Sequence, residues 1–126
     1  MKSPLLNKVL LVAALGMFSQ FATADNESAA KSIAGVLVNL NHFPSAEEKV
    51  TLKAISEDEG TGRAFRAVAL AVHNIQHAAT AEDKASMAQV IANGMAAAEA
   101  KELAEIVVSF NHMPSADAKA ALQAML

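Results

Sequence analysis

Three of the four histidines in this 126-residue chain stand 35 residues apart, at His42, His77 and His112. Each follows Asn or Gln, and each is followed three residues later by Ser or Thr. Imidazole is the commonest metal ligand in proteins, so a repeated histidine of this kind could form a metal or haem site. The alternative is that duplication has copied a structural residue three times.

The structural interpretation places His42, His77 and His112 at the C-terminal ends of three helices. There an imidazole can bond the last free carbonyls and stabilise the negative end of the helix dipole. Helix pairs stacked in a row lie about 8–10 Å apart, whereas metal–nitrogen bonds of about 2.0–2.1 Å require close ligands. We therefore expect equivalent histidines to remain separate unless the array curls sharply.

His73 and His77 form a second candidate site, because residues at i and i+4 share one face of a helix. Position 73 corresponds to Val38 and Val108 in the other copies, so this histidine departs from the repeat. The catalytic glutamate of the HExxH zinc motif is missing, since Asn74 occupies its position. The spacing predicts at most a site for Cu, Ni or Zn, completed by His112 or Met113, in a metal or small-ligand carrier.

The chain lacks the residues that several other kinds of functional site require. The chain has no Cys, Trp or Tyr, which excludes thiol catalysis, Cys-ligated zinc and iron–sulfur clusters. The acidic pairs that begin at Glu47 and Glu82 follow helix start signals, where the dipole stabilises the charged carboxylate and disfavours an acid–base role. We therefore expect no catalytic residues and no enzyme, and our favoured interpretation includes no cofactor.

Helices must position these side chains. Apolar residues recur at spacings of three and four before each histidine, as in Val68, Val72 and Ile75, which is typical of an amphipathic helix. After each histidine, Ser45, Thr80 and Ser115 are favourable N-cap residues followed by acidic side chains. Each unit is thus predicted to be a helix, a tight turn and a second helix.

The fold class that follows is all-α, with three 35-residue helix-turn-helix repeats and six helices. The expected helices span residues 28–42, 45–58, 63–77, 80–93, 97–112 and 115–126, in units of about 28–62, 63–97 and 98–126. The pattern does not decide between a short α-solenoid-like array and a compact helical bundle.

Residues 1–24 resemble a secretory signal peptide. Lys2 and Lys8 precede a ten-residue apolar stretch, and Ala22-Thr23-Ala24 is a small-x-small cleavage site. Ten apolar residues are too few to span a bilayer of about 30 Å, so no stable membrane anchor is expected after cleavage. Residues 25–126 would then form a single exported domain, periplasmic or extracellular, that begins at Asp25.

The charge of residues 25–126 bears on partners. Eight Lys and Arg stand against thirteen Asp and Glu, a net charge of −5, which disfavours nucleic acid as a partner. Short helical arrays expose a groove of recurring side chains that commonly binds proteins. The sequence therefore favours an exported, non-enzymatic repeat module that binds a protein of unknown identity, with the metal or small-ligand carrier as the alternative.

Overall fold

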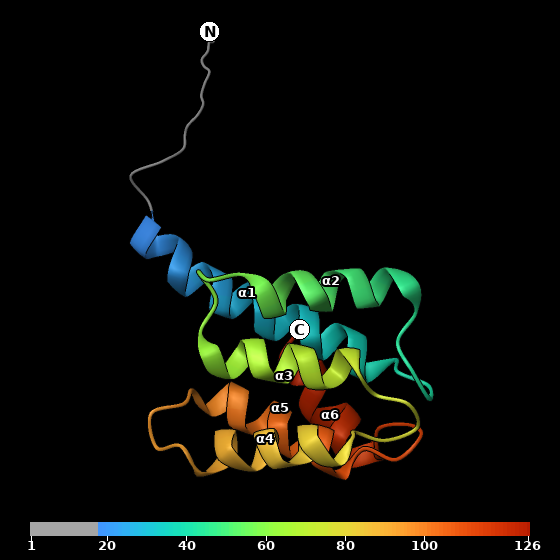
Figure 1. Ribbon diagram of the computed structural model, residues 1–126. Coiled ribbons are helices and arrows are strands. Elements are labelled where there is room, and N and C mark those ends of the chain that lie inside the picture. Colours follow the sequence, from blue (N-terminus) through green and yellow to red (C-terminus); the bar gives the residue numbers. More distant parts are fainter. Residues whose placement is uncertain (1–17) are drawn as a thin grey trace, which may run out of the picture.

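The computed structural model describes residues 18–126, and this part of the chain is helical, with six α-helices and no strands beyond isolated bridges (Figure 1). The all-α fold class with six helices is confirmed. The helices are α1 (Phe18–Val38), α2 (Ala46–Glu57), α3 (Arg63–His73), α4 (Ala81–Ala92), α5 (Ala98–Ser109) and α6 (Ala116–Ala124).

The second helix of each unit begins where its polar cap residue dictates. Ser45, Thr80 and Ser115 are the N-cap residues of α2, α4 and α6, and each side-chain oxygen accepts a hydrogen bond from the backbone N–H three residues later. In α2 the Glu48 carboxylate also accepts from the Ser45 N–H, which completes a capping box. These bonds satisfy backbone donors that the helix itself leaves free.

The first helix of each unit is shorter than the sequence predicted. The helices α1, α3 and α5 end at Val38, His73 and Ser109, whereas we expected them to continue to positions 42, 77 and 112. Pro44 and Pro114 disfavour helix only at the residue directly before them. The extra shortening arises because the chain turns away from each helix to reach a contact among all three units.

The three units close into a ring. The first helices, α1, α3 and α5, contact one another, and the second helix of each unit packs mainly on the first helix of the next, as α2 on α3 and α4 on α5. Helix α6 packs on α1 in the same way and closes the circle (Figure 1). The structure is therefore a closed bundle with approximate threefold symmetry, the second of the two arrangements that the repeat allowed.

Equivalent apolar positions supply the core. Three sets of three are fully buried on the inner helices: Ile33, Val68 and Leu103; Ala34, Ala69 and Ala104; Leu37, Val72 and Val107. The outer helices contribute Leu52, Met87 and Leu122, which are also fully buried. The small Ala set allows the three inner helices to approach one another, and the larger sets fill the space between the layers.

Most of the predicted signal peptide, residues 1–17, lies outside the described residues, and the predicted cleavage site after Ala24 falls within α1. The described core residues of α1 begin at Ala29, so cleavage there would retain all of them. None of the helices in the described part of the chain combines the length and hydropathy that a membrane crossing requires.

Closure changes what we expect from the core of the end units. An open array would leave Val107 covered on one side only, but both Val72 and Val107 are completely buried. Val72→Ala and Val107→Ala should therefore lower the free energy of unfolding by similar amounts, about 1–3 kcal/mol. Urea denaturation measures both; a clearly smaller loss for Val107→Ala would contradict the closed ring.

The N-cap residues provide a second test of the predicted helix boundaries. Ser45→Ala, Thr80→Ala and Ser115→Ala should each cost about 0.5–2 kcal/mol, because each leaves a helix N–H without its acceptor. Ser86→Ala is the matched control, since Ser86 is an exposed residue within α4. Thermal unfolding measures all four variants. If Ser86→Ala lowered the melting temperature as much as the cap variants do, the capping bonds would make no specific contribution to stability.

Candidate metal centre

The three loops between the paired helices meet at one end of the bundle, to the right in Figure 1. At the centre of each loop stands the repeated histidine, with φ of 72° at His42, 69° at His77 and 68° at His112. They are the only non-glycine residues with positive φ in the described part of the chain. Such a conformation is unfavourable for a residue with a Cβ and concentrates at functional sites, so three equivalent cases point to a site here.

A ring of backbone hydrogen bonds holds the histidines together. The N–H of His77 donates to the carbonyl of His42 at 2.6 Å, the N–H of His112 donates to His77 at 2.6 Å, and the N–H of His42 donates to His112 at 2.7 Å. Each histidine thus donates once and accepts once, and the ring links all three units. The positive φ is the local cost of this arrangement, offset by paired backbone groups.

Buried side chains fix each loop on both sides of its histidine. Two residues before it stand Leu40, Ile75 or Phe110, and two residues after it stand Pro44, Ala79 or Pro114; all six are buried. Asn41 and Phe43 are bridged across His42, with the Phe43 N–H donating to the Asn41 carbonyl at 2.8 Å, and Met113 and Asn111 repeat this bond. The turn therefore has little freedom to move, and its histidine is presented in a defined position.

The imidazoles converge as a result. Their ring centroids lie 5.0 Å apart for His42 and His77 and 5.1 Å apart for the other two pairs. One ring nitrogen from each of the three residues lies within 4.8 Å of the others. A tetrahedral ion with bonds of about 2.0–2.1 Å needs nitrogens about 3.3 Å apart, a distance that small side-chain rotations can reach.

Neighbouring amides orient two of the rings. The Oδ1 of Asn41 lies 2.5 Å from Nδ1 of His42, and the Oδ1 of Asn111 lies 2.6 Å from Nδ1 of His112. An amide oxygen can only accept, and the tautomer that donates to it from Nδ1 leaves the lone pair of Nε2 free for a metal. This support of a ligand by a hydrogen bond to its other nitrogen is typical of histidine in metal sites.

The helix-end interpretation of these histidines is wrong. They lie three or four residues beyond the last residues of their helices, Val38, His73 and Ser109, and their N–H groups bond another histidine. The dipole's influence falls off within the last helical turn, so it does not explain why the repeat keeps a histidine at this position. The histidines were expected to remain apart unless the array curls sharply, and this exception applies, because the units surround an axis where a linear stack would separate them.

The predicted pair of His73 and His77 does not form on a helix face. Helix α3 ends at His73, so His77 is not one helical turn further along it. The half-buried His73 instead contacts its neighbour, with Nδ1 2.9 Å from Oδ1 of Asn74. His77 joins the two other repeated histidines. The informative signal in the sequence was the repeated amide–histidine dipeptide between buried residues, and not the i, i+4 spacing.

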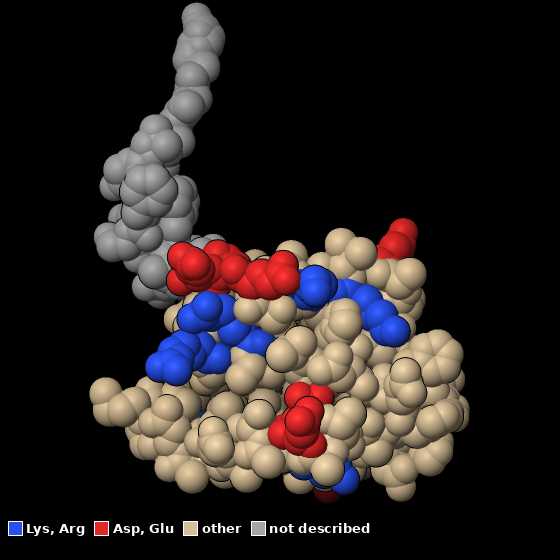
Figure 2. Space-filling view, viewed as in Figure 1, with Lys and Arg blue, Asp and Glu red and all other residues tan. Residues whose placement is uncertain are grey.

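The cluster of His42, His77 and His112 is accessible to solvent. His42 is half-buried, while His77 and His112 are exposed. Phe43 and Met113, which directly follow two of the histidines, are 57% and 54% exposed. Figure 2 shows acidic side chains over the left end of α2, where residues 57–59 are exposed, and a further acidic group at the upper right. Next to the histidine loops, the first turns of α2, α4 and α6 carry Glu47, Glu82 and Asp117.

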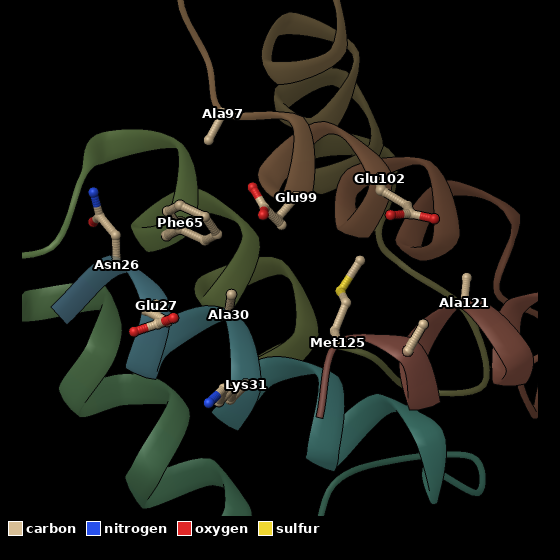
Figure 3. Close-up of a pocket in the computed structure, with 11 residues that line it drawn as sticks. Asn26, Glu27, Ala30, Lys31, Phe65, Ala97, Glu99, Glu102, Ala121 and Met125 are labelled. Atoms are coloured by element: carbon tan, nitrogen blue, oxygen red, sulfur yellow. The ribbon is translucent and has the colours of Figure 1, made fainter. Parts of the chain in front are cut away.

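A larger cavity of about 610 Å³ lies towards the opposite ends of the helices. Figure 3 shows Phe65 and Met125 beside the space between α1 and α5, with the carboxylates of Glu99 and Glu102 along α5. The cavity marks the junction between the last unit and the first. Among the described residues, the histidine cluster alone has the geometry of a metal site.

Comparison of the chain with known proteins finds no matching family model, no matching curated protein and no matching solved structure. The site must therefore be judged by its own geometry.

The strain at the histidines can be tested without metal. Alanine retains the Cβ that makes a φ of 69° unfavourable, whereas glycine does not. With a chelator present, His77→Gly should be about 1 kcal/mol more stable than His77→Ala. Urea unfolding measures the difference. At the neighbouring Ala78, where φ is not positive, the change from Ala to Gly should lower stability. If the change from Ala to Gly at position 77 lowered stability by the same amount, the backbone there would not be strained.

Proposed function

We propose that this protein binds a divalent transition metal ion through His42, His77 and His112. The observation that carries the proposal is the convergence of three ring nitrogens within 4.8 Å, from three units of one chain. The backbone ring between the same residues supports it, because it brings the ligands together before any ion arrives. Preorganisation of this kind lowers the cost of ordering the ligands on binding.

The donor set indicates which metals fit. Three neutral imidazoles suit Zn(II), Cu(II) and Ni(II), whereas Mg(II) and Ca(II) prefer oxygen ligands. Three protein ligands leave at least one coordination position open for water or another ligand. Because His77 and His112 are exposed, that position can exchange its occupant with solvent or with another molecule.

A carrier or sensor of metal fits this arrangement better than an enzyme does. Catalytic sites usually enclose their substrates and exclude water, whereas this centre lies at the surface. The signal-peptide pattern of residues 1–24 supports export, and a cysteine-free metal site would resist oxidation outside the cytoplasm. We therefore propose an exported, non-enzymatic metal-binding protein.

Protein binding is the second candidate function, and one observation favours it. Phe43 and Met113 are more than half exposed beside the centre, and aromatic and methionine side chains are enriched in protein interfaces. A partner that contacts these residues would meet the metal at the same time. This surface would suit a protein that delivers the ion or receives it.

Thermal unfolding with and without metal tests the proposed function. Zn(II), Cu(II) or Ni(II) should stabilise residues 25–126 by mass action, by about 2.7 kcal/mol when free metal is about 100 times its Kd. His42→Asn, His77→Asn and His112→Asn should each abolish most of this effect, since Asn tolerates positive φ but removes the imidazole. His73→Asn is the matched control and should keep it.

Acid should remove the metal effect, because a protonated imidazole cannot ligate an ion. The wild-type melting temperature should therefore depend on metal near neutral pH and become independent of it when the solution is acidified. Metal stabilisation that persists in all three His→Asn variants, or that only His73→Asn removes, would overturn the proposed function.

A further inference from the structure

A cavity of about 330 Å³ adjoins the histidine centre. It is lined by Phe43 and Lys49 of the first unit and by Gln76 and His77 of the second. His77 thus belongs both to the proposed metal centre and to the wall of this cavity. A ligand in the cavity would therefore contact one of the three proposed metal ligands.

The middle unit departs from the repeat at this wall. Gln76 stands where the other units have Asn41 and Asn111, whose amides contact the imidazole that follows them. Among the described residues, no such contact joins Gln76 to His77, and Gln76 lines the cavity instead. Its amide is therefore placed to donate a hydrogen bond to a ligand there.

Lys49 gives the cavity its charge. It is half-buried, whereas its counterparts in the repeat, Lys84 and Lys119, are exposed. Of the acidic groups nearest to it in α2, Glu48 is engaged in the capping box with Ser45, and Glu47 is exposed. An ammonium group beside a divalent cation attracts an anion, and a bound cation is often the largest local charge in a site.

Phe43 adds an apolar wall. Ligand sites commonly combine apolar and aromatic lining with a few polar groups that orient the ligand. The cavity offers this combination: one aromatic ring, one ammonium, one amide and one metal-ligating histidine. A short-chain carboxylate matches all of them, with its charged head towards the metal and Lys49 and its hydrocarbon part against Phe43.

We propose that a short-chain carboxylate anion occupies this cavity and completes the coordination of the ion held by the three histidines. The inference rests on the proposed metal-binding function and names the class of its additional ligand. Neutral molecules of the same size would lack the attraction to Lys49 and to the ion.

Cobalt(II) provides the test, because its visible absorption depends on its ligands and geometry. The cobalt-loaded protein is titrated with sodium acetate and sodium butyrate at constant ionic strength, with sodium chloride as the balancing salt. We expect a saturable spectral change with both carboxylates and tighter binding of butyrate, because its longer hydrocarbon chain contacts Phe43.

Three variants connect that change to the cavity. Lys49→Gln should weaken carboxylate binding about three- to fivefold, the range expected for one partly exposed charge pair. Lys84→Gln, the matched control at the equivalent position, should leave it unchanged. Phe43→Ala should weaken binding of butyrate more than that of acetate.

The outcomes separate the two proposals. A cobalt spectrum that carboxylates do not change would refute the inference and leave the metal centre standing. Equal weakening in Lys49→Gln and Lys84→Gln would also refute it, because the anion would then respond to general charge and not to this cavity. Failure of the protein to bind cobalt at all would refute the metal centre and, with it, the carboxylate site.

Discussion

The closed ring of three backbone hydrogen bonds between the repeated histidines is the constraint on which the rest of this structure depends. Each N–H donates to the carbonyl of the histidine in another unit, at 2.6–2.7 Å, and each of the three histidines has a positive φ. The ring needs all three units at once. It therefore explains why the inner helices end early and why the last helix returns to pack on the first.

The same ring of hydrogen bonds brings the three repeated imidazoles together in one cluster. A duplicated residue in a linear array appears once per unit along a surface, whereas a duplicated residue beside a threefold axis meets its own copies. The three imidazoles lie 5.0–5.1 Å apart for this reason. Their neighbours Asn41 and Asn111 then orient two of the rings without any residue from elsewhere in the chain.

The middle unit departs from the threefold symmetry of the histidine centre. In the middle unit, Gln76, Ala78 and Ala79 replace the Asn, the large apolar residue and the Pro of the other units. The change leaves a cavity beside His77 that contains Lys49 from the preceding unit. The surroundings of His77 therefore differ in charge and shape from those of His42 and His112.

The sequence by itself determined the helical content, the three helix-turn-helix units and the residues of the core, because helix periodicity and capping are local properties of the chain. Ile33, Val68 and Leu103 could be assigned to the interior from spacing alone. The same local information misplaced the ends of α1, α3 and α5, since a helix end that serves a contact between units leaves no local signal when the next residues are also compatible with helix.

Only the tertiary structure decided that the array closes and that the histidines meet. The spacing of 35 residues is the same for a linear stack and for a ring, and closure depends on whether α6 fits against α1 as α2 fits against α3. The i, i+4 pair of His73 and His77 was the stronger local pattern, yet His77 lies beside residues 35 positions away in either direction. A long-range backbone bond that is favourable only when three distant loops assemble together cannot be deduced from any one of them.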